Sequence, residues 1–586
     1  MKIYTADFET TTTETSPNET WVWSWGVREL YKKQSFEYGY DIEGFMSLCR
    51  RGNVKDSKLF YFHNLKFDGF FLLDYLLRNG VKWVDGENRK EEENTFKTLI
   101  TKEGLFYSIE WIIERNQKNV KKAIFRDSHK KLPFSVKKIA KDFKLPILKG
   151  DIEYTKVRPK GYTPTQEELE YLYNDVEIMA QALEIQIDQG QDSMTIGSDS
   201  LKTFKEIISE KAFDRYFPVL DDSVNTFIRK SYKGGFTYLN PKFKSKIVYR
   251  GKVYDVNSLY PAMMLKPMPY GVPLRYTGKY IENRLYPMYV QRLICEFEVK
   301  ENMIPTIQIK DDPRFKSTEY LTSTRGEMVE LTLTSVDLEL MFKHYDVIVY
   351  EWVGGYMFKK IEGIFTDYIK RFMHIKENSE GAIRELAKLL LNNLYGKFAT
   401  STDATGKIPK WDKENDCVVL EEGDEKTKES IYTAVGSYIT SYARETTINA
   451  CQNNYERFIY ADTDSLHVEG VEPVTNIEVH TSEIGKWDNE ANFIKGKFIR
   501  AKTYMEEVAV KKVGEDDEGK PIYKPCSFEE MESTKLKVTC AGMPDKLKKT
   551  VTFDNFQVGQ IYEGKLKPKV VKGGVILVNT DFTIKA

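Results

Sequence analysis

The sequence predicts a multidomain protein in which an α/β unit is followed by a mixed α+β unit. Its 586 residues exceed what one hydrophobic core usually holds, because a domain typically takes about 100 to 200 residues. Strand-like segments alternate with helix-like segments over residues 1–190, which is typical of an α/β domain. A polar, glycine-bearing stretch at 190–240 indicates a boundary, and acidic strands and a long helix beyond it predict the second unit.

The overall composition is that of a well-packed protein from a reducing compartment. Hydrophobic residues make up 41% and charged residues 30%, which excludes a disordered or fibrous chain, while the net charge of −1 favours no charged partner. The cysteines form no CxxC pair and have no histidine at zinc-finger spacing, so neither a disulfide framework nor a structural zinc is expected. No uncharged apolar run approaches the roughly 18 residues that span a bilayer, and acidic residues come too early for a signal peptide. We therefore expect a cytoplasmic protein without a membrane partner.

Positive charge is concentrated in two stretches of the chain. Residues 130–150 contain seven lysines and one acidic residue, and residues 534–586 contain ten lysines and four acidic residues. Stretches of this kind neutralise the phosphates of nucleic acids, although solvated surface lysines explain either stretch equally well when it is taken alone.

Acidic residues of the first unit are expected to converge. MKIYTADFETT alternates like a strand, so Asp7 and Glu9, two residues apart, share one face of it. Asp68 lies where a second strand-like run passes into a helix that stops at Gly80.

A later helix contributes a fourth acidic residue. TPTQEELEYLYNDVEIMAQALEIQ begins with a capping box of Thr165 and Glu168 and continues with helical spacing. Tyr171 and Asp175 then lie one turn apart on the same face.

The second unit carries acidic residues at the ends of strands. KVYDVNSLYP predicts a strand that ends in a turn with Asp255 at its tip, and FIYADTDSLHV predicts a hairpin whose turn holds Asp462 and Asp464. Between them, EGAIRELAKLLLNNLYGKFA predicts an amphipathic helix. One stripe of this helix carries Arg384, Lys388, Asn392 and Tyr395.

Carboxylates at a strand tip and a hairpin turn suit two-metal nucleotidyl transfer. Two Mg²⁺ ions about 3.5–4 Å apart lower the pKa of an attacking hydroxyl and stabilise the leaving oxygen. We expect Asp255 and Asp464 to bridge the ions, the Val256 carbonyl to be a further ligand, and Asp462 to support them. Any single aspartate in a turn is more often a turn or capping residue, so the prediction depends on the whole set.

The helical stripe offers cations for triphosphate oxygens and an aromatic face for a nucleobase. A solvated helix face is an equally good interpretation of the stripe alone. Tyr260, shortly after Asp255, is placed to form the floor of the sugar pocket and to collide with a 2′-hydroxyl, although an ordinary core tyrosine would show the same pattern.

The acidic residues of the first unit predict a hydrolytic site, because two metal ions held there would activate water for phosphodiester cleavage. Tyr171 is expected to orient that water and Lys149 to meet the scissile phosphate. His63, Asn64 and Phe67 would grip and stack a frayed single-stranded end, since aromatic stacking tolerates any base. Taken singly, each is as readily a packing residue or a surface lysine.

Six motifs, in order, identify a family. DFET, NLKFD and YLYND resemble three exonuclease motifs, and DVNSLYP, KLLLNNLYG and YADTDS resemble polymerase motifs A, B and C of family B DNA polymerases, followed by KTY. Order and spacing match from residue 3 to about residue 585. The compact length, a YKGG element and inserts on either side of motif B resemble the protein-primed subgroup found in small phages with linear genomes.

The resemblance implies an RNase H-like 3′→5′ exonuclease domain and a right-hand polymerase domain with palm, fingers, thumb and two subgroup-specific insertions. The implied ranges are 1–190 for the exonuclease, 191–266 and 433–540 for the palm, 267–363 and 400–432 for the insertions, 364–399 for the fingers and 541–586 for the thumb. The first insertion is implied to contact terminal protein and duplex DNA. The second is implied to enclose DNA and to unwind the template.

The resemblance also implies contacts, residue by residue. Contacts with the incoming nucleotide are implied for Val256, Ser258, Tyr260, Lys376, Arg384, Lys388, Asn392 and Tyr395. Contacts with single-stranded DNA are implied for Thr10, His63, Asn64, Phe67, Ser128, His129, Phe134 and Tyr154. Contacts with primer and template are implied for Tyr232, Gly234, Gly235, Lys502 and Tyr504.

The implied activity is DNA-directed DNA synthesis with 3′→5′ proofreading, in the cytoplasm of an infected bacterial host. Each active site would use two Mg²⁺ or Mn²⁺ ions, and dNTPs would be the substrates. Members of the subgroup start on a serine hydroxyl of a terminal protein and then copy processively while displacing the other strand. The implied partners are DNA template and primer, a terminal protein in a heterodimer, and phage single-stranded and double-stranded DNA-binding proteins.

Two positions depart from the family pattern. Asn393 stands where motif B usually has serine, which affects the handling of the template. His129 stands where an apolar residue usually follows Ser128, which affects the packing of the editing strand. Neither change removes a metal ligand.

Three other interpretations remain open on the sequence. A primer-dependent family B polymerase without terminal protein would share the catalytic motifs, and only the two insertions argue against it. A nuclease with an inert C-terminal half would not need Asp255, Asp462 and Asp464. A non-catalytic DNA-binding protein would not need acidic residues facing a polyanion, since each costs Coulomb repulsion unless a metal intervenes.

Overall fold

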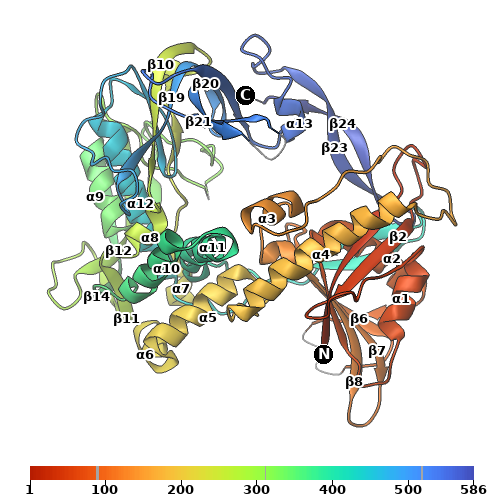
Figure 1. The fold of residues 1–586 in the computed structure, drawn as a ribbon. Coiled ribbons are helices and arrows are strands. Elements are labelled where there is room, and N and C mark those ends of the chain that lie inside the picture. Colours follow the sequence, from red (N-terminus) through yellow and green to blue (C-terminus); the bar gives the residue numbers. More distant parts are fainter. Residues whose placement is uncertain (87–90, 311, 516–518, 586) are drawn as a thin grey trace.

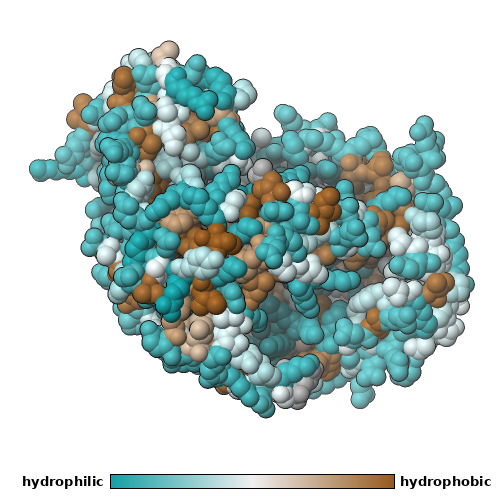
Figure 2. Space-filling model, turned by 90° about the horizontal axis from the view of Figure 1, so that it is seen from above, coloured by the Kyte–Doolittle hydropathy of each residue, from teal (hydrophilic) through white to brown (hydrophobic). Residues whose placement is uncertain are grey.

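The computed structural model describes residues 1–86, 91–310, 312–515 and 519–585. In Figure 1 the N-terminal segments lie on the right, the middle of the chain runs along the bottom and the left, and the C-terminal strands return toward the N-terminal segments. Figure 2 views the molecule from above and shows a surface that is hollowed toward its middle and covered mostly by hydrophilic residues. The fold is the predicted combination of several α/β and α+β units.

The first unit is built on a mixed sheet of eight strands in the order β3-β2-β1-β4-β8-β7-β6-β5. These strands are β1 Lys2–Thr10, β2 Val22–Glu29, β3 Glu37–Gly39, β4 Lys58–Phe62, β5 Lys82–Trp83, β6 Thr95–Ile100, β7 Phe106–Arg115 and β8 Val120–Asp127. β1 runs parallel to β4 and antiparallel to β2, so the predicted first strand lies in the interior of the sheet.

Helices cover both faces of this sheet. They are α1 Ile42–Arg50, α2 Leu65–Arg78, a 3₁₀ turn at Ser128–Lys130, α3 Val136–Asp142 and α4 Gln166–Asp188. Residues of α1 and α2 share one hydrophobic core with the strands, and residues of α4 belong to a second core. Because the side chains of β1 alternate between these cores, its acidic residues face α4.

A second sheet forms the centre of the C-terminal half, with the strand order β21-β20-β19-β10-β18-β17-β9 and with β22 paired to β20. Its strands are β9 Thr237–Leu239, β10 Ile247–Val256, β17 Phe458–Asp462, β18 Ser465–Glu469, β19 Trp487–Arg500, β20 Thr503–Glu515, β21 Pro521–Pro525 and β22 Ser533–Cys540. The predicted hairpin is confirmed, since β17 and β18 pair with Asp462 opposite Ser465. β18 also pairs with β10, and Asp255 lies opposite Ser465. The end of the strand that carries Asp255 and the turn of the predicted hairpin therefore meet at the same end of the sheet.

Helices surround this second sheet. They are α5 Ile196–Ile208, α6 Glu210–Tyr216, α7 Asp222–Arg229, α8 Leu259–Met263, α10 Thr366–Asn378, α11 Gly381–Phe398 and α12 Thr433–Asn453, with a 3₁₀ turn at Pro241–Phe243. The polar stretch expected to be a boundary is largely helical, because polar residues such as Thr195 and Ser209 cap α5 and α6 rather than forming a loop. α5 packs against α11, with the Ser200 hydroxyl donating to the Leu390 carbonyl at 3.3 Å.

Residues 267–363 form a unit with a sheet of their own, in the strand order β11-β14-β12-β13. It comprises β11 Met268–Thr277, β12 Met288–Val299, β13 Val329–Thr334, α9 Ser335–His344 and β14 Tyr345–Ile361. β12, β13, α9 and β14 enclose a separate hydrophobic core around Leu293, Leu331 and Met341. This segment therefore folds as a distinct layer beside the second sheet.

Two hairpins that are distant in sequence pack onto the first unit. They are β15 Lys407–Asp412 with β16 Cys417–Glu422, and β23 Ile561–Val571 with β24 Gly574–Thr583, the latter preceded by α13 Asp545–Lys548. Val418 and Val575 enter the core formed by α1, α2 and the first sheet. Asp416 accepts ion pairs from Arg78 and Lys572, which ties the two hairpins to α2. In Figure 1, β23 and β24 extend from α13 to the neighbourhood of α2.

No helix in the described part of the chain combines the length and the apolar character needed to cross a membrane.

Candidate active sites

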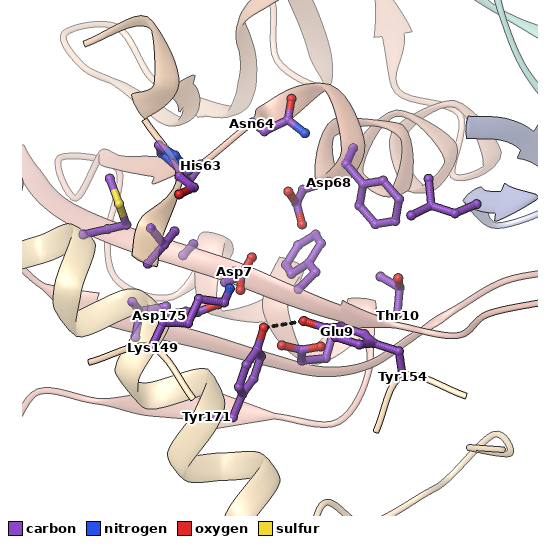
Figure 3. Close-up of a pocket in the computed structure, with 18 of the residues that line it drawn as sticks. Asp7, Glu9, Thr10, His63, Asn64, Asp68, Lys149, Tyr154, Tyr171 and Asp175 are labelled. Atoms are coloured by element: carbon purple, nitrogen blue, oxygen red, sulfur yellow. Dashed lines mark hydrogen bonds and ion pairs between the residues drawn. The ribbon is translucent and has the colours of Figure 1, made fainter. Parts of the chain in front are cut away.

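The first unit contains a cavity of about 460 Å³ on the α4 side of its sheet (Figure 3). Many residues predicted for the exonuclease line it, namely Asp7, Glu9, Thr10, His63, Asn64, Phe67, Asp68, Lys149, Tyr154, Tyr171 and Asp175. These side chains come from β1, from the start of α2, from α4 and from the loop before α4. The structure thus brings together all four predicted acidic residues of this unit.

Strand alternation and a capping box place these carboxylates. Phe8 of β1 packs into the core beneath α1 and α2, which turns its neighbours Asp7 and Glu9 toward α4. The predicted capping box is present, with the Glu168 N–H donating to Thr165 Oγ1 at 3.3 Å and the Thr165 N–H donating to Glu168 Oε2 at 2.9 Å. α4 therefore begins where expected and presents Tyr171 and Asp175 to the cavity.

Crowding of buried carboxylates dominates the electrostatics of this cavity. Burial and the nearby Asp175 raise the pKa of Asp7 to about 7. Burial and Asp7 likewise raise the pKa of Glu9 and of Asp68 well above their ordinary values. Such a cluster stores like-charge repulsion that a bound cation would relieve.

Lys149 already contributes one positive charge to the cluster. Its Nζ donates to Asp175 Oδ2 at 2.5 Å and lies 5.0 Å from the centre of the Tyr171 ring. Burial lowers the pKa of Lys149, but the ion pair with Asp175 outweighs burial and leaves that pKa raised. The Tyr171 and Tyr154 hydroxyls are hydrogen-bonded at 2.7 Å, so both phenols are held at the mouth of the cluster (Figure 3).

The donor set of the cavity fits hard divalent cations, which prefer carboxylate oxygens. Asp68 Oδ1 and Asp175 Oδ1 are buried, and neither has a hydrogen-bond partner among the described residues. As the side chains stand, no three His, Cys, Asp or Glu residues within the described ranges converge on one point closely enough to enclose a metal.

Ser128, His129 and Phe134 were predicted to bind single-stranded DNA, but they lie behind the cavity instead of lining it. His63 Nδ1 is bonded to Ser128 Oγ at 3.0 Å, and His63 Nε2 to the Phe134 carbonyl at 2.7 Å. Burial lowers the pKa of His63 to about 4, so its ring is neutral at physiological pH. The His129 ring lies 5.3 Å from the His63 ring, where it packs against the imidazole. Ser128, Phe134 and His129 thus surround His63, which itself faces the cavity.

Sequence reasoning missed residues that line the same cavity. Thr11 and Thr12 line it, and their position directly after Thr10 at the end of the predicted strand could have indicated them. Leu577 of β24 also lines it, from almost the opposite end of the chain. No local signal identifies Leu577, because its place depends on the docking of the C-terminal hairpin.

The second cluster lies where β10 meets the β17–β18 hairpin. The Val256 N–H donates to the Asp464 carbonyl at 2.9 Å, which joins the end of β10 to the hairpin turn. Burial, Asp464 and Glu490 raise the pKa of Asp255 to about 7, and burial raises the pKa of Asp464. Asp255 and Asp464 are therefore half-buried and close enough to repel each other, which suits a site for divalent cations.

Two further acidic residues belong to this region and were not predicted. Asp488 lies directly opposite Asp255 in the pairing of β10 with β19, and Glu490 is near enough to raise the pKa of Asp255. The neighbouring strand supplies both, so only the strand order brings them to the site.

Asp462 is held differently from the other two aspartates of the second cluster. It accepts hydrogen bonds from Thr237 Oγ1 at 2.9 Å and from the Tyr460 hydroxyl at 3.3 Å, and it pairs with Lys502 Nζ at 3.1 Å. Its oxygens are thus engaged by protein donors, which agrees with a supporting rather than a bridging position.

The glycine-rich YKGG element packs against this turn. Thr463 has a left-handed φ of 63°, and its N–H donates to the Phe236 carbonyl at 2.6 Å. A Cβ on Gly235 would lie 2.7 Å from the Thr463 side chain, closer than non-bonded atoms allow. Arg444 donates to the Lys233 and Gly234 carbonyls at 2.7 and 2.8 Å, which fixes the element from the other side.

If the second cluster carries out the nucleotidyl transfer expected from the sequence, replacing Gly235 with alanine should lower its rate about tenfold, because the new methyl group displaces the turn between Asp462 and Asp464. The measurement is single-nucleotide insertion on a primer-template, with degradation of single-stranded DNA as the control. Gly86→Ala is the control variant, since a Cβ there meets nothing within 4 Å and Gly86 lies in the first unit, outside both clusters. Equal losses in the two variants would contradict the steric explanation.

The predicted stripe on α11 lies next to the second cluster, and its Tyr395 stacks on Tyr260. The Tyr260 and Tyr395 rings lie 4.0 Å apart with an interplanar angle of 17°. Lys376 of α10 donates to Ser258 Oγ at 3.2 Å, and Arg384 donates to the Lys376 carbonyl at 3.0 Å. The exposed stripe residues on this helix are Arg384, Lys388 and Asn392. The departure at Asn393 is satisfied locally, because its amide donates to the Leu389 carbonyl at 2.7 Å.

The remaining residues predicted to contact DNA border the same region. Lys502 is exposed and left-handed, with φ 56°, at the turn between β19 and β20. Tyr504 is 8% exposed and packs against Tyr460 at 5.0 Å between ring centres. Tyr232 is half-buried beside the YKGG backbone.

Comparison with known proteins identifies the family of this chain. The family profile described as DNA polymerase type B, organellar and viral, matches residues 49–483. The DNA polymerases of Bacillus phages Nf and phi29 are each 46% identical over the whole chain, and that of Streptococcus phage Cp-1 is 33% identical over 99% of the chain and 98% of its own length. The structure of phi29 DNA polymerase complexed with primer-template DNA superimposes with a TM-score of 0.93 at 45% identity over all of both chains, and its complex with single-stranded DNA with a TM-score of 0.92 at 44% identity. The chain therefore belongs to the type B DNA polymerases of the organellar and viral group, and within it to the protein-primed DNA polymerases of phi29-like phages.

Proposed function

We propose that this DNA polymerase also proofreads, with synthesis and 3′→5′ degradation carried out at two separate metal-dependent sites. The observation that carries the proposal is the presence of two clusters of crowded carboxylates, one in the first unit and one on the second sheet, each containing an aspartate whose pKa is raised to about 7. Acidic residues crowded in this way on a protein that handles a polyanion have a use only if cations are bound.

At the polymerase site, Asp255, Asp464 and the Val256 carbonyl would hold two Mg²⁺ or Mn²⁺ ions. The ions supply a lowered pKa for the primer 3′-hydroxyl and charge stabilisation for the leaving pyrophosphate. Asp462 supports the turn and orients Lys502, which holds the primer terminus together with Tyr504.

The fingers helices would bind the incoming dNTP. Lys376, Arg384 and Lys388 neutralise triphosphate oxygens, and the Arg384 bond to the Lys376 carbonyl keeps two of these cations together. Ser258 and Asn392 contribute polar contacts nearby. The stack of Tyr260 on Tyr395 forms a flat wall that supports base and sugar and leaves no room for a 2′-hydroxyl.

At the exonuclease site, the four carboxylates of the first cavity would hold the second pair of ions, which activate water for cleavage. Tyr171 orients the water, and Lys149 turns from Asp175 to the scissile phosphate. Phe67, Asn64 and Thr10 line the wall on which the unpaired 3′ end lies, and Tyr154 closes it beside Tyr171. Hydrogen bonds to the Ser128 hydroxyl and the Phe134 carbonyl hold the His63 ring in place, and the His129 ring packs against it.

The units correspond to functional domains in this proposal. Residues 1–190 are the exonuclease, 191–266 and 433–540 the palm, 364–399 the fingers and 541–586 the thumb. YKGG residues Tyr232, Gly234 and Gly235 lie in the first palm segment, beside the turn that carries Thr463, and guide primer and template. The first insertion, 267–363, has its own core and a surface for terminal protein and duplex DNA. The second, 400–432, closes the template path against the exonuclease.

We infer protein-primed initiation and strand displacement from the subgroup to which the chain is similar. The partners would be DNA template and primer, a terminal protein whose serine hydroxyl starts the chain, and phage DNA-binding proteins, within the cytoplasm of an infected bacterium. A primer-dependent polymerase without terminal protein would keep both catalytic sites but would have no use for the first insertion.

The direct test is one reaction with purified protein, Mg²⁺ and a labelled primer on a long single-stranded circle, with and without the four dNTPs. Products longer than the circle establish processive synthesis with strand displacement, and shortening without dNTPs establishes the exonuclease. EDTA should stop both. A primer that is extended but never shortened would overturn the proofreading half of the proposal.

Replacing residues 407–422 with a short Gly-Ser linker is expected to end strand displacement. The β15–β16 hairpin packs on α2 beside the C-terminal hairpin, so its loss opens the enclosure around the template. On the circle, products should stop near one lap, while filling of a short single-stranded gap proceeds at the wild-type rate. Products longer than the circle from this variant would show that the second insertion is dispensable for unwinding.

A further inference from the structure

A buried pair, His467 and Glu506, lies in the palm core close to the polymerase carboxylates, and the chemistry proposed above does not use it. His467 Nδ1 and Glu506 Oε1 are 2.8 Å apart, and the two side chains are 1% and 0% exposed. His467 belongs to β18 and Glu506 to β20, which are separated in the sheet by β19 and β10. The bond therefore crosses the face of the sheet.

Stability alone does not account for this pair. Burying ionisable groups costs free energy, and packed apolar residues at such positions are often as stable or more stable. Here His467 Nε2 and Glu506 Oε2 are buried without a further hydrogen-bond partner among the described residues, which adds to the cost. The neighbouring core is otherwise apolar and aromatic.

The imidazole is surrounded by aromatic rings. The His467 ring lies 5.3 Å from Tyr460, 5.1 Å from Tyr504 and 5.7 Å from Phe498, and each contact is edge to face. Because Glu506 holds one edge of the imidazole, the plane of that ring is fixed, and the tyrosines pack against a fixed surface.

The tyrosine that His467 supports reaches the catalytic turn. The Tyr460 hydroxyl donates to Asp462 Oδ2 at 3.3 Å and accepts from the Lys502 N–H at 2.8 Å. Lys502 Nζ returns to Asp462 Oδ1 at 3.1 Å. The Tyr460 hydroxyl thus links Asp462 in the hairpin turn to the turn that carries Lys502. His467 lies directly opposite Tyr460 in the pairing of β17 with β18.

We propose that His467 and Glu506 are positioning residues of the polymerase site. By holding the imidazole between Tyr460 and Tyr504, they set where Asp462 and Lys502 lie, and so how firmly the primer terminus stays in the polymerase site. The proposal rests on the proposed function, because it acts through residues assigned there to the primer and to the metal turn.

The experiment compares Glu506→Leu with Glu506→Gln, which keeps an oxygen acceptor for His467. Val510→Ala is the matched control, because Val510 lies on the same strand and in the same core. Each variant is assayed for the rate of single-nucleotide insertion, for conversion of dNTP to dNMP on a matched primer-template, and for degradation of single-stranded DNA. Glu506→Leu is expected to lower insertion about tenfold and to raise dNMP release per stable insertion, with single-strand degradation unchanged. Glu506→Gln and Val510→Ala should stay within about twofold of the wild type.

His467→Asn provides a second approach should Glu506→Leu not fold. Its amide nitrogen replaces Nδ1 as the donor to Glu506, but the ring that faces Tyr460 and Tyr504 is lost, so it should lower insertion like Glu506→Leu. Three outcomes would overturn the positioning role. They are equal behaviour of Glu506→Leu and Val510→Ala, a parallel loss of insertion and single-strand degradation, and failure of both Glu506→Leu and His467→Asn to fold. If Asp255→Ala retained synthesis, the assignment of the site itself would be wrong, whereas a normal Glu506→Leu beside an inactive Asp255→Ala would reject only this inference.

Discussion

Asp255→Ala is expected to lower the rate of nucleotide insertion by about a thousandfold or more while single-stranded DNA is degraded at the wild-type rate. Asp255 and Asp464 are half-buried and close enough to repel each other, so in the proposed site they would share the cations between them. Losing one bridging carboxylate removes several kcal/mol of transition-state stabilisation, and each 1.36 kcal/mol corresponds to a factor of ten in rate. Asp464→Ala should behave in the same way. The measurement is rapid-quench insertion of one nucleotide on a primer-template.

Two controls separate this chemical effect from misfolding. Binding of primer-template with Ca²⁺ in place of Mg²⁺ should stay within severalfold of the wild type, because phosphate contacts made elsewhere supply most of the affinity. Degradation of single-stranded DNA reports on the first unit of the same preparation. If Asp255→Ala also abolished degradation, the two-site interpretation would fail.

The double variant Asp7→Ala, Glu9→Ala is expected to give the reverse result, with degradation reduced by about a thousandfold or more and insertion on matched primers unchanged. Both carboxylates face the 460 Å³ cavity, and burial together with the neighbouring carboxylates raises the pKa of each. Removing them leaves too few oxygens to hold two cations. The measurement is release of single nucleotides from a 5′-labelled single strand in Mg²⁺.

A folding control accompanies the double variant. Because the buried carboxylates repel one another, their removal should not lower the melting temperature measured in EDTA. Errors should also accumulate during synthesis, since mismatched ends are no longer removed. An unchanged error frequency together with lost degradation would show that the cavity cleaves DNA without editing the polymerase's own products.

The same pair of variants distinguishes this enzyme from a non-catalytic DNA-binding protein. A binding protein would bind DNA more tightly when acidic residues facing the phosphates are removed, and no turnover would exist to be lost. A nuclease with an inert C-terminal half would show no effect of Asp255→Ala in any assay.

Much of both sites could be predicted from the sequence because the signals are local. Alternation along β1 places Asp7 and Glu9 on the same face of the strand. The capping box of Thr165 and Glu168 determines where α4 begins. The turn between β17 and β18 determines the position of Asp464. Each of these depends on residues within a few positions of one another, so a single segment carries the information.

Other features depended on which surfaces dock. Leu577 reaches the cavity of the first unit only because the C-terminal hairpin packs on α2, and Glu490 reaches Asp255 only because β19 lies beside β10. Ser128 is buried behind His63 because β4 and β8 are neighbours in the first sheet. Nothing in the spacing of these residues indicates that they meet.

By itself, the sequence determined the acidic residues, the elements that carry them and the order of the motifs, because strand alternation, helix capping and turn chemistry act over a few residues. Only the tertiary structure decided which hairpins close onto the first unit, and that His467 meets Glu506 across the sheet. Those contacts join segments tens to hundreds of residues apart. They are selected by the burial of whole surfaces, which local periodicity does not encode.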